Sequence, residues 1–147
     1  VTGCPPGLGE PVFDRLQARL SAAMMSINAA KGFEYGDGFK IAERRGSEVV
    51  DNFSTDNKGN IITLSNHSGG IQGGISNGMP INMRIAFKPT PTIAREIETV
   101  DAFGTSTVLK AKGRHDPCVV PRAVPVVEAM ASMVIFDSIL ENRSSKI

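Results

Sequence analysis

Hydrophobic residues recur every three or four positions near the start of the chain. This spacing over Glu10–Ile27 predicts an amphipathic helix with one buried face. Pro11 suits its first turn, where the missing N–H costs no hydrogen bond, and Asn28 fits a C-cap just beyond its end. The apolar positions are Val12, Phe13, Leu16, Leu20, Met24 and Ile27, and the polar positions outside this face are Asp14, Arg15, Gln17 and Arg19.

Short β-prone runs separated by turn residues occupy the middle of the chain. Gly, Asn, Asp and Pro break these runs, as is typical of antiparallel strands and hairpins. We predict strands at Gly32–Tyr35 and Met79–Phe87, a hairpin over Phe53–Leu64 that turns at Asn57–Asn60, a second hairpin from Glu98–Asp101 and Thr105–Lys110, one or two helical turns around Phe39–Ala42 ended by Gly46, and a loop at Ser47–Asn52.

The segment from Val124 to Leu140 is apolar nearly all round, which is the pattern of a fully buried helix. Together with the predicted strands, it indicates an α+β fold in which antiparallel strands and hairpins pack with helices. No repeat, low-complexity tract or composition shift divides the sequence. A single domain spanning residues 1–147 is therefore expected.

Composition and charge argue against several classes of function. The chain has 147 residues, 41% of them hydrophobic, and a formal net charge of +1, which gives no reason to expect a nucleic-acid or membrane-surface binder. Cys4 and Cys118 lack metal-ligand spacing, so we expect reduced thiols in an intracellular protein and no metal site. We see no secretory signal and no apolar run of about 18 residues, which predicts a protein that is neither exported nor membrane-spanning. The opening at Val1 looks like the middle of a longer protein.

Three segments are candidate ligand-binding sites, and each could instead be a solvated loop or turn. Ser65–Gly78 carries five glycines that could admit a flat or phosphorylated ligand, but it matches no phosphate-binding motif, and a simple loop is the favoured reading. Lys88–Thr92 could bind an anion or could be a solvated loop. Gly113 and Pro117 enclose Arg114, His115 and Asp116 in a stiff turn, which fits either a binding site or a solvated turn.

Five motifs in this chain resemble successive motifs of the chorismate synthase family, and they occur in the family's order. The last motif, which combines Arg-x-Asp-Pro-Cys with a Glu-Ala helix, is the most specific. The resemblance implies the C-terminal portion of a longer cytoplasmic enzyme, built as a β-α-β sandwich and assembled from four subunits. The motifs are GLGEPVFD, AMMSINAAKGFEYGDGF, SNHSGGIQGGISNG, KPTPTI and KGRHDPCVVPRAVPVVEAM.

The resemblance also implies a reaction of the shikimate pathway, which leads to the aromatic amino acids. Chorismate synthase removes phosphate and a ring proton from 5-enolpyruvylshikimate 3-phosphate in a 1,4-elimination. The lyase requires reduced FMN, although the reaction has no net redox change, and NADPH is the expected reductant.

Carried over to this sequence, the resemblance implies a set of site residues. Asp116 matches an acidic residue near flavin N5 that is thought to help move the proton. Pro91 stands where the family often has Ser, which removes one amide donor and one hydroxyl from the flavin loop. The implied FMN contacts are Asn28, Ala29, Gly73, Lys88, Pro89, Thr90, Pro91, Thr92 and Arg114.

The two histidines thought to act as general acids belong to the family's N-terminal half, and neither His67 nor His115 replaces them. We therefore expect the isolated chain to be inactive. The alternatives are a non-catalytic module of the same fold that binds flavin or a phosphorylated ligand, and a structural domain whose glycines only form tight turns.

Overall fold

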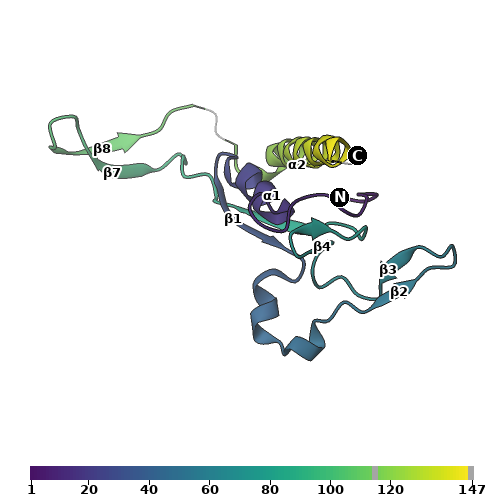
Figure 1. Ribbon diagram of the computed structural model, residues 1–147. Coiled ribbons are helices and arrows are strands. Elements are labelled where there is room, and N and C mark those ends of the chain that lie inside the picture. The colour runs from purple at the N-terminus through teal and green to yellow at the C-terminus, as the bar shows by residue number, and fades with distance from the viewer. Residues whose placement is uncertain (114–115, 146–147) are drawn as a thin grey trace.

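Helix α1 lies against the antiparallel pair of β1 and β6, and α2 packs beside α1 (Figure 1). The computed structural model describes residues 1–113 and 116–145. The elements are α1 (Leu16–Met25), β1 (Ala30–Tyr35), the 3-10 helices η1 (Gly38–Glu43) and η2 (Gly46–Glu48), β2 (Phe53–Thr55), β3 (Ile61–Thr63), β4 (Ile71–Gln72), β5 (Ile75–Ser76), β6 (Met83–Phe87), β7 (Glu96–Val100), β8 (Ser106–Lys110) and α2 (Val120–Ser144).

The core is small and lies between α1, α2 and one face of the β1–β6 pair. Leu16, Leu20 and Met24 on α1 are fully buried, which confirms the hydrophobic spacing there. Arg19 on the side of α1 that faces α2 forms ion pairs with two carboxylates of α2 and so holds the two helices together. The other buried members of this cluster are Cys4, Leu8, Ile71, Ile81, Ala131 and Ile135.

The predicted start of the first helix is wrong. The helix begins at Leu16, because Phe13 and Asp14 have positive φ angles of 55° and 42°, which no α-helix accommodates. The Leu16 N–H donates to the Gly74 carbonyl at 2.8 Å, so a tertiary contact fixes the helix start. Val12 and Phe13 are exposed, and the C-cap is Ser26 rather than Asn28.

The fold class is confirmed as α+β with antiparallel pairing. Within the described ranges the strands form four two-stranded sheets, β1–β6, β2–β3, β4–β5 and β7–β8. The two predicted hairpins are the pairs β2–β3 and β7–β8, and Figure 1 shows both extending away from the core. Strand β1 begins two residues earlier than predicted, at Ala30.

Three local predictions differ from the structure. The strand predicted from Met79 begins only at Met83. The glycine-rich segment, read as a simple loop, contains the short β4–β5 hairpin. The loop predicted at Ser47–Asn52 begins inside η2. In the first two cases the backbone bonds to a distant residue, as Ile81 does to Val1, or pairs two strands of only two residues each, and propensity does not report such pairing.

The composition of the C-terminal helix predicted burial on all sides, but the structure buries only one face of it. It begins at Val120, so Pro125 lies inside it, and it buries one face at Ala131 and Ile135. Its opposite side leaves apolar residues open, including Met133 and Phe136, which are 58% and 62% exposed. An all-apolar helix therefore has a second face that the described residues leave uncovered.

Helix α2 also bears on the predicted lack of a membrane-spanning segment. Its mean hydropathy reaches 1.7 over 18 residues, so by length and composition it could cross a membrane. This criterion therefore does not bear out the expectation that the chain has no such segment, which stays a prediction. One helix of this kind is weak support for a membrane protein, because core helices of soluble proteins pass the same test.

Both cysteines are free thiols, as predicted. Cys4 is buried in the core and Cys118 is exposed just before α2. Burial raises the pKa of the Cys4 thiol, which disfavours its reactive thiolate form.

Candidate functional site

Two of the segments predicted to bind flavin meet at one end of β1. Asn28 and Ala29 connect α1 to β1, and Lys88 follows β6, the pairing partner of β1. The Lys88 N–H donates to the Ala29 carbonyl at 2.9 Å, and Ala29 has a φ of 71°. We call residues 28–29 together with residues 88–92 the loop edge.

The loop edge offers a cation and an unused hydroxyl. Lys88 is exposed, whereas the Thr90 Oγ1 atom is buried and has no hydrogen-bond partner among the described residues. Pro89, Pro91 and Thr92 are exposed beside them. A buried hydroxyl without a partner is costly, which favours a ligand here.

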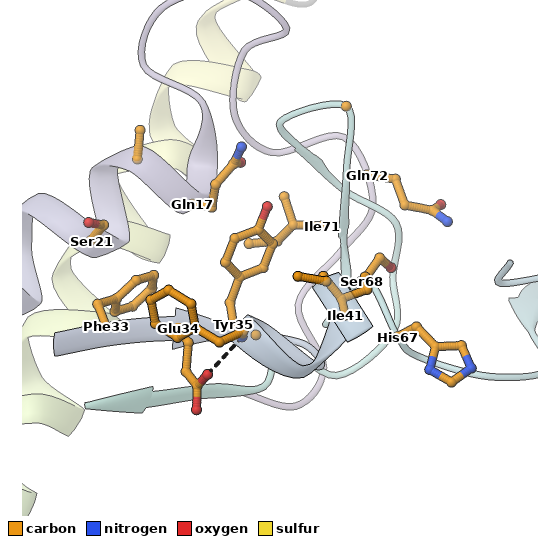
Figure 2. Close-up of a pocket in the computed structure, with 15 residues that line it drawn as sticks. Gln17, Ser21, Phe33, Glu34, Tyr35, Ile41, His67, Ser68, Ile71 and Gln72 are labelled. Atoms are coloured by element: carbon orange, nitrogen blue, oxygen red, sulfur yellow. Dashed lines mark hydrogen bonds between the residues drawn. The ribbon is translucent and has the colours of Figure 1, made fainter. Parts of the chain in front are cut away.

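Gly73 lies apart from the loop edge, in a groove near the other end of β1. This groove, the α1–β1 groove, has a volume of about 770 Å³ and lies between α1, β1, η1 and the glycine-rich segment. Figure 2 shows Tyr35 pointing into it between Gln17 and Ile71. Phe33 stacks beside Tyr35 with ring centroids 6.4 Å apart.

The groove is suited to an uncharged or aromatic group. No Lys or Arg is among its lining residues within the described part of the chain, and its floor is aromatic and aliphatic. A phosphate would find its cation at Lys88 on the loop edge instead. The groove therefore suits an uncharged or aromatic part of a ligand, and the loop edge suits its phosphate.

Asp116 lies between β8 and α2 and is partly buried, with 32% of its side chain exposed. Its Oδ2 atom lies 3.0 Å from the Nη1 atom of Arg122 in the first turns of α2. The N-cap of α2 is Val119, which makes no side-chain capping bond, so Asp116 is not the helix cap. Arg114 and His115 lie outside the described residues.

Two carboxylates that the sequence did not single out hold the glycine-rich segment. Asp51 is only 7% exposed and accepts bonds from the Ser65 hydroxyl at 2.6 Å and from the His67 and Ser68 backbone N–H groups at 2.8 Å. Asp37 lies 2.7 Å from His67 Nδ1. Nothing in the sequence signals these pairings, because the partners lie 14 to 30 positions apart.

These bonds make Asp51 a pH-sensitive stabilising group. Burial alone would raise the pKa of Asp51, but the bonds from Ser65, Ser68 and His67 outweigh it and lower the pKa to about 2. A folded-state pKa below the usual 3.8 means that the stabilisation is complete above about pH 4 and is lost as the pH falls towards 2.

We expect the Asp51→Asn variant to lose this pH dependence. The shift from 3.8 to about 2 corresponds to about 2 kcal/mol of unfolding free energy at neutral pH. Urea unfolding of both proteins between pH 2 and 7 should show wild type more stable at pH 7, with the difference shrinking towards pH 2. A difference that stays constant over this range would contradict the assignment.

The comparisons with known proteins agree with one another. A family model described as chorismate synthase matches residues 1–140. Chorismate synthase of Bacteroides fragilis is 59% identical over the whole chain, which covers 41% of that protein, and the enzyme of Parabacteroides distasonis is 61% identical over 138 residues, 38% of its length. A crystal structure of chorismate synthase superposes with a TM-score of 0.75 at 38% identity, covering 95% of this chain and 35% of the solved chain.

These matches place the chain in a family of biosynthetic enzymes with a mixed α+β fold. The chain belongs to the chorismate synthase family. Chorismate synthases are lyases of the shikimate pathway, which supplies the aromatic amino acids. The chain spans about 40% of the length of the curated relatives it matches.

Proposed function

We propose that the protein carrying this chain removes phosphate from 5-enolpyruvylshikimate 3-phosphate by 1,4-elimination and releases chorismate. The observation that carries this proposal is the family match over residues 1–140. The meeting of Ala29 and Lys88 supports it, because it joins two separate motifs in one place.

The loop edge fits an FMN cofactor. Lys88 supplies a positive charge for the phosphate, and the buried Thr90 hydroxyl has a free bonding capacity for a phosphate or ribityl oxygen. Asn28 and Ala29 form the turn against which the cofactor would rest, with Pro89, Pro91 and Thr92 completing the loop. We also assign Arg114 and Gly73 to FMN binding. Reduced FMN supplies the electron density that helps the phosphate leave.

We assign the proton-accepting role to Asp116. A partly buried carboxylate paired with a cation is held in one position, which suits a general base. The Arg122 guanidinium fixes the carboxylate from one side and leaves its second oxygen available to a proton. This role rests on the family resemblance and on the position of Asp116 before α2.

The finer features of the protein follow from the same family. We propose a cytoplasmic homotetramer in which this chain forms one domain, the C-terminal portion, and in which NADPH keeps FMN reduced. The exposed apolar residues of α2 and of the β7–β8 hairpin support a larger assembly, because contiguous apolar surface marks an interface.

Phosphate release tests the proposal directly. The full-length protein, given reduced FMN and 5-enolpyruvylshikimate 3-phosphate, should release phosphate and form chorismate. The 147-residue chain alone should release none, because it spans only about 41% of a relative such as the Bacteroides fragilis enzyme. FMN binding by the full-length protein without turnover would instead make it a non-catalytic flavin module. Phosphate release by the chain alone would show that the remaining length is dispensable.

A further inference from the structure

The glycine-rich segment is fixed by groups that lie outside it. Asp51, which precedes β2, receives three hydrogen bonds from Ser65, His67 and Ser68. The His67 ring is tied to Asp37, which also pairs with Arg44 at 3.0 Å. Two carboxylates thus hold Ser65, His67 and Ser68.

The fixed residues lead directly into the wall of the α1–β1 groove. His67 and Ser68 line the groove, and so do Ile71 and Gly73 a few residues later. Gly69 packs its backbone against Gly36, where any added Cβ would overlap main-chain atoms. Only two residues separate the fixed Ser68 from β4, and Gly69 between them is in close contact with Gly36. The position of residues 65–68 therefore sets the position of β4 and of the turn at Gly73.

We infer that Asp51 is a positioning residue for ligand binding, because its carboxylate sets the conformation of the glycine-rich wall that carries Gly73. The inference rests on the proposed function, in which Gly73 contacts FMN. A carboxylate can accept all three bonds at once, whereas an asparagine side chain turns an NH₂ group towards at least one of the donors. One N–H or O–H group would then be left without an acceptor, and the segment would shift to find one.

The test compares two Asp→Asn variants of the full-length protein. Asp51→Asn removes the buried carboxylate. Asp56→Asn removes a carboxylate that also accepts two backbone N–H bonds, from Lys58 and Asn60, but lies in the β2–β3 turn outside the groove. FMN is titrated at a temperature where circular dichroism shows each variant folded, and hydrogen exchange is measured at the amides of residues 67–73. Ser65→Ala, which removes one of the three bonds, is a milder third variant.

We expect Asp51→Asn to weaken FMN binding by about tenfold or more, the loss of one hydrogen bond to a charged group, while Asp56→Asn stays near wild type. Exchange at residues 67–73 should quicken in Asp51→Asn and, to a smaller extent, in Ser65→Ala. Unchanged FMN affinity in a destabilised but folded Asp51→Asn protein would overturn the inference and leave the proposed function intact. A wild-type protein that does not bind FMN would overturn both. If Asp51→Asn does not fold, unchanged affinity and exchange in Ser65→Ala would count against the inference.

Discussion

Replacing Asp116 with asparagine in the full-length protein is expected to lower kcat by on the order of 10²-fold or more and to leave FMN binding largely intact. Asparagine keeps the size and most of the hydrogen bonding of aspartate, but it cannot accept a proton. A structural role predicts little effect, since Asp116 does not cap α2 and the Arg122 side chain that pairs with it is largely exposed. Steady-state kinetics with parallel flavin titration distinguish the general-base role of Asp116 from a structural role.

Arg122→Gln is the matched control for Asp116→Asn. It breaks the same ion pair but retains the Asp116 carboxylate, so it should lose much less turnover than Asp116→Asn. Arg114→Lys adds a second comparison, since it keeps the charge but loses the planar fork and should weaken ligand affinity more than folding. Asp116→Asn turning over near the wild-type rate would remove Asp116 from the mechanism. Equal losses in Asp116→Asn and Arg122→Gln would assign the effect to the ion pair.

A single methyl group at Gly36 is expected to be among the most destabilising changes in the chain. Gly36 has a φ of 57°, and an added Cβ would overlap the His67 carbonyl oxygen and lie 2.8 Å from the Gly69 nitrogen. The left-handed backbone costs about 1–2 kcal/mol for alanine, and overpacking against main-chain atoms adds about 1–3 kcal/mol. Urea unfolding of Gly36→Ala should therefore show a loss of about 3 kcal/mol or more.

Gly59→Ala separates the two contributions. Gly59 also has a positive φ, 81°, but an alanine Cβ there would meet no atom within 4 Å. This variant should lose only the backbone contribution, about 1–2 kcal/mol. If both variants lose the same free energy of unfolding, the contact between Gly36 and the glycine-rich segment has no energetic weight.

The hairpins illustrate what the sequence determines by itself. The β2–β3 turn is built from Asp56, whose carboxylate accepts bonds from Lys58 and Asn60, and from the positive φ of Gly59. The β7–β8 turn repeats the arrangement with Asp101, which accepts from Phe103 and Thr105. All these contacts span five residues or fewer, so the local sequence contains every partner and sequence analysis located both turns.

The family resemblance was also present in the sequence, because it depends on residue types in order. It identified Ala29 and Lys88, which the structure brings together, although they lie far apart along the chain. Periodicity likewise located the buried face of α1 at Leu16, Leu20 and Met24. Side-chain type and spacing carry this information without reference to the rest of the fold.

Tertiary contacts decided the features that composition misread. The α1 helix starts at Leu16 because Gly74, 58 positions away, accepts its N–H, and no local propensity contains that partner. The apolar composition of α2 predicts that the helix is buried, but it does not show which face is buried. The elements that pack against α2 determine that face. Asp51 gains its low pKa from Ser65, His67 and Ser68 only when the fold brings them around it, since an isolated aspartate has water for its partner.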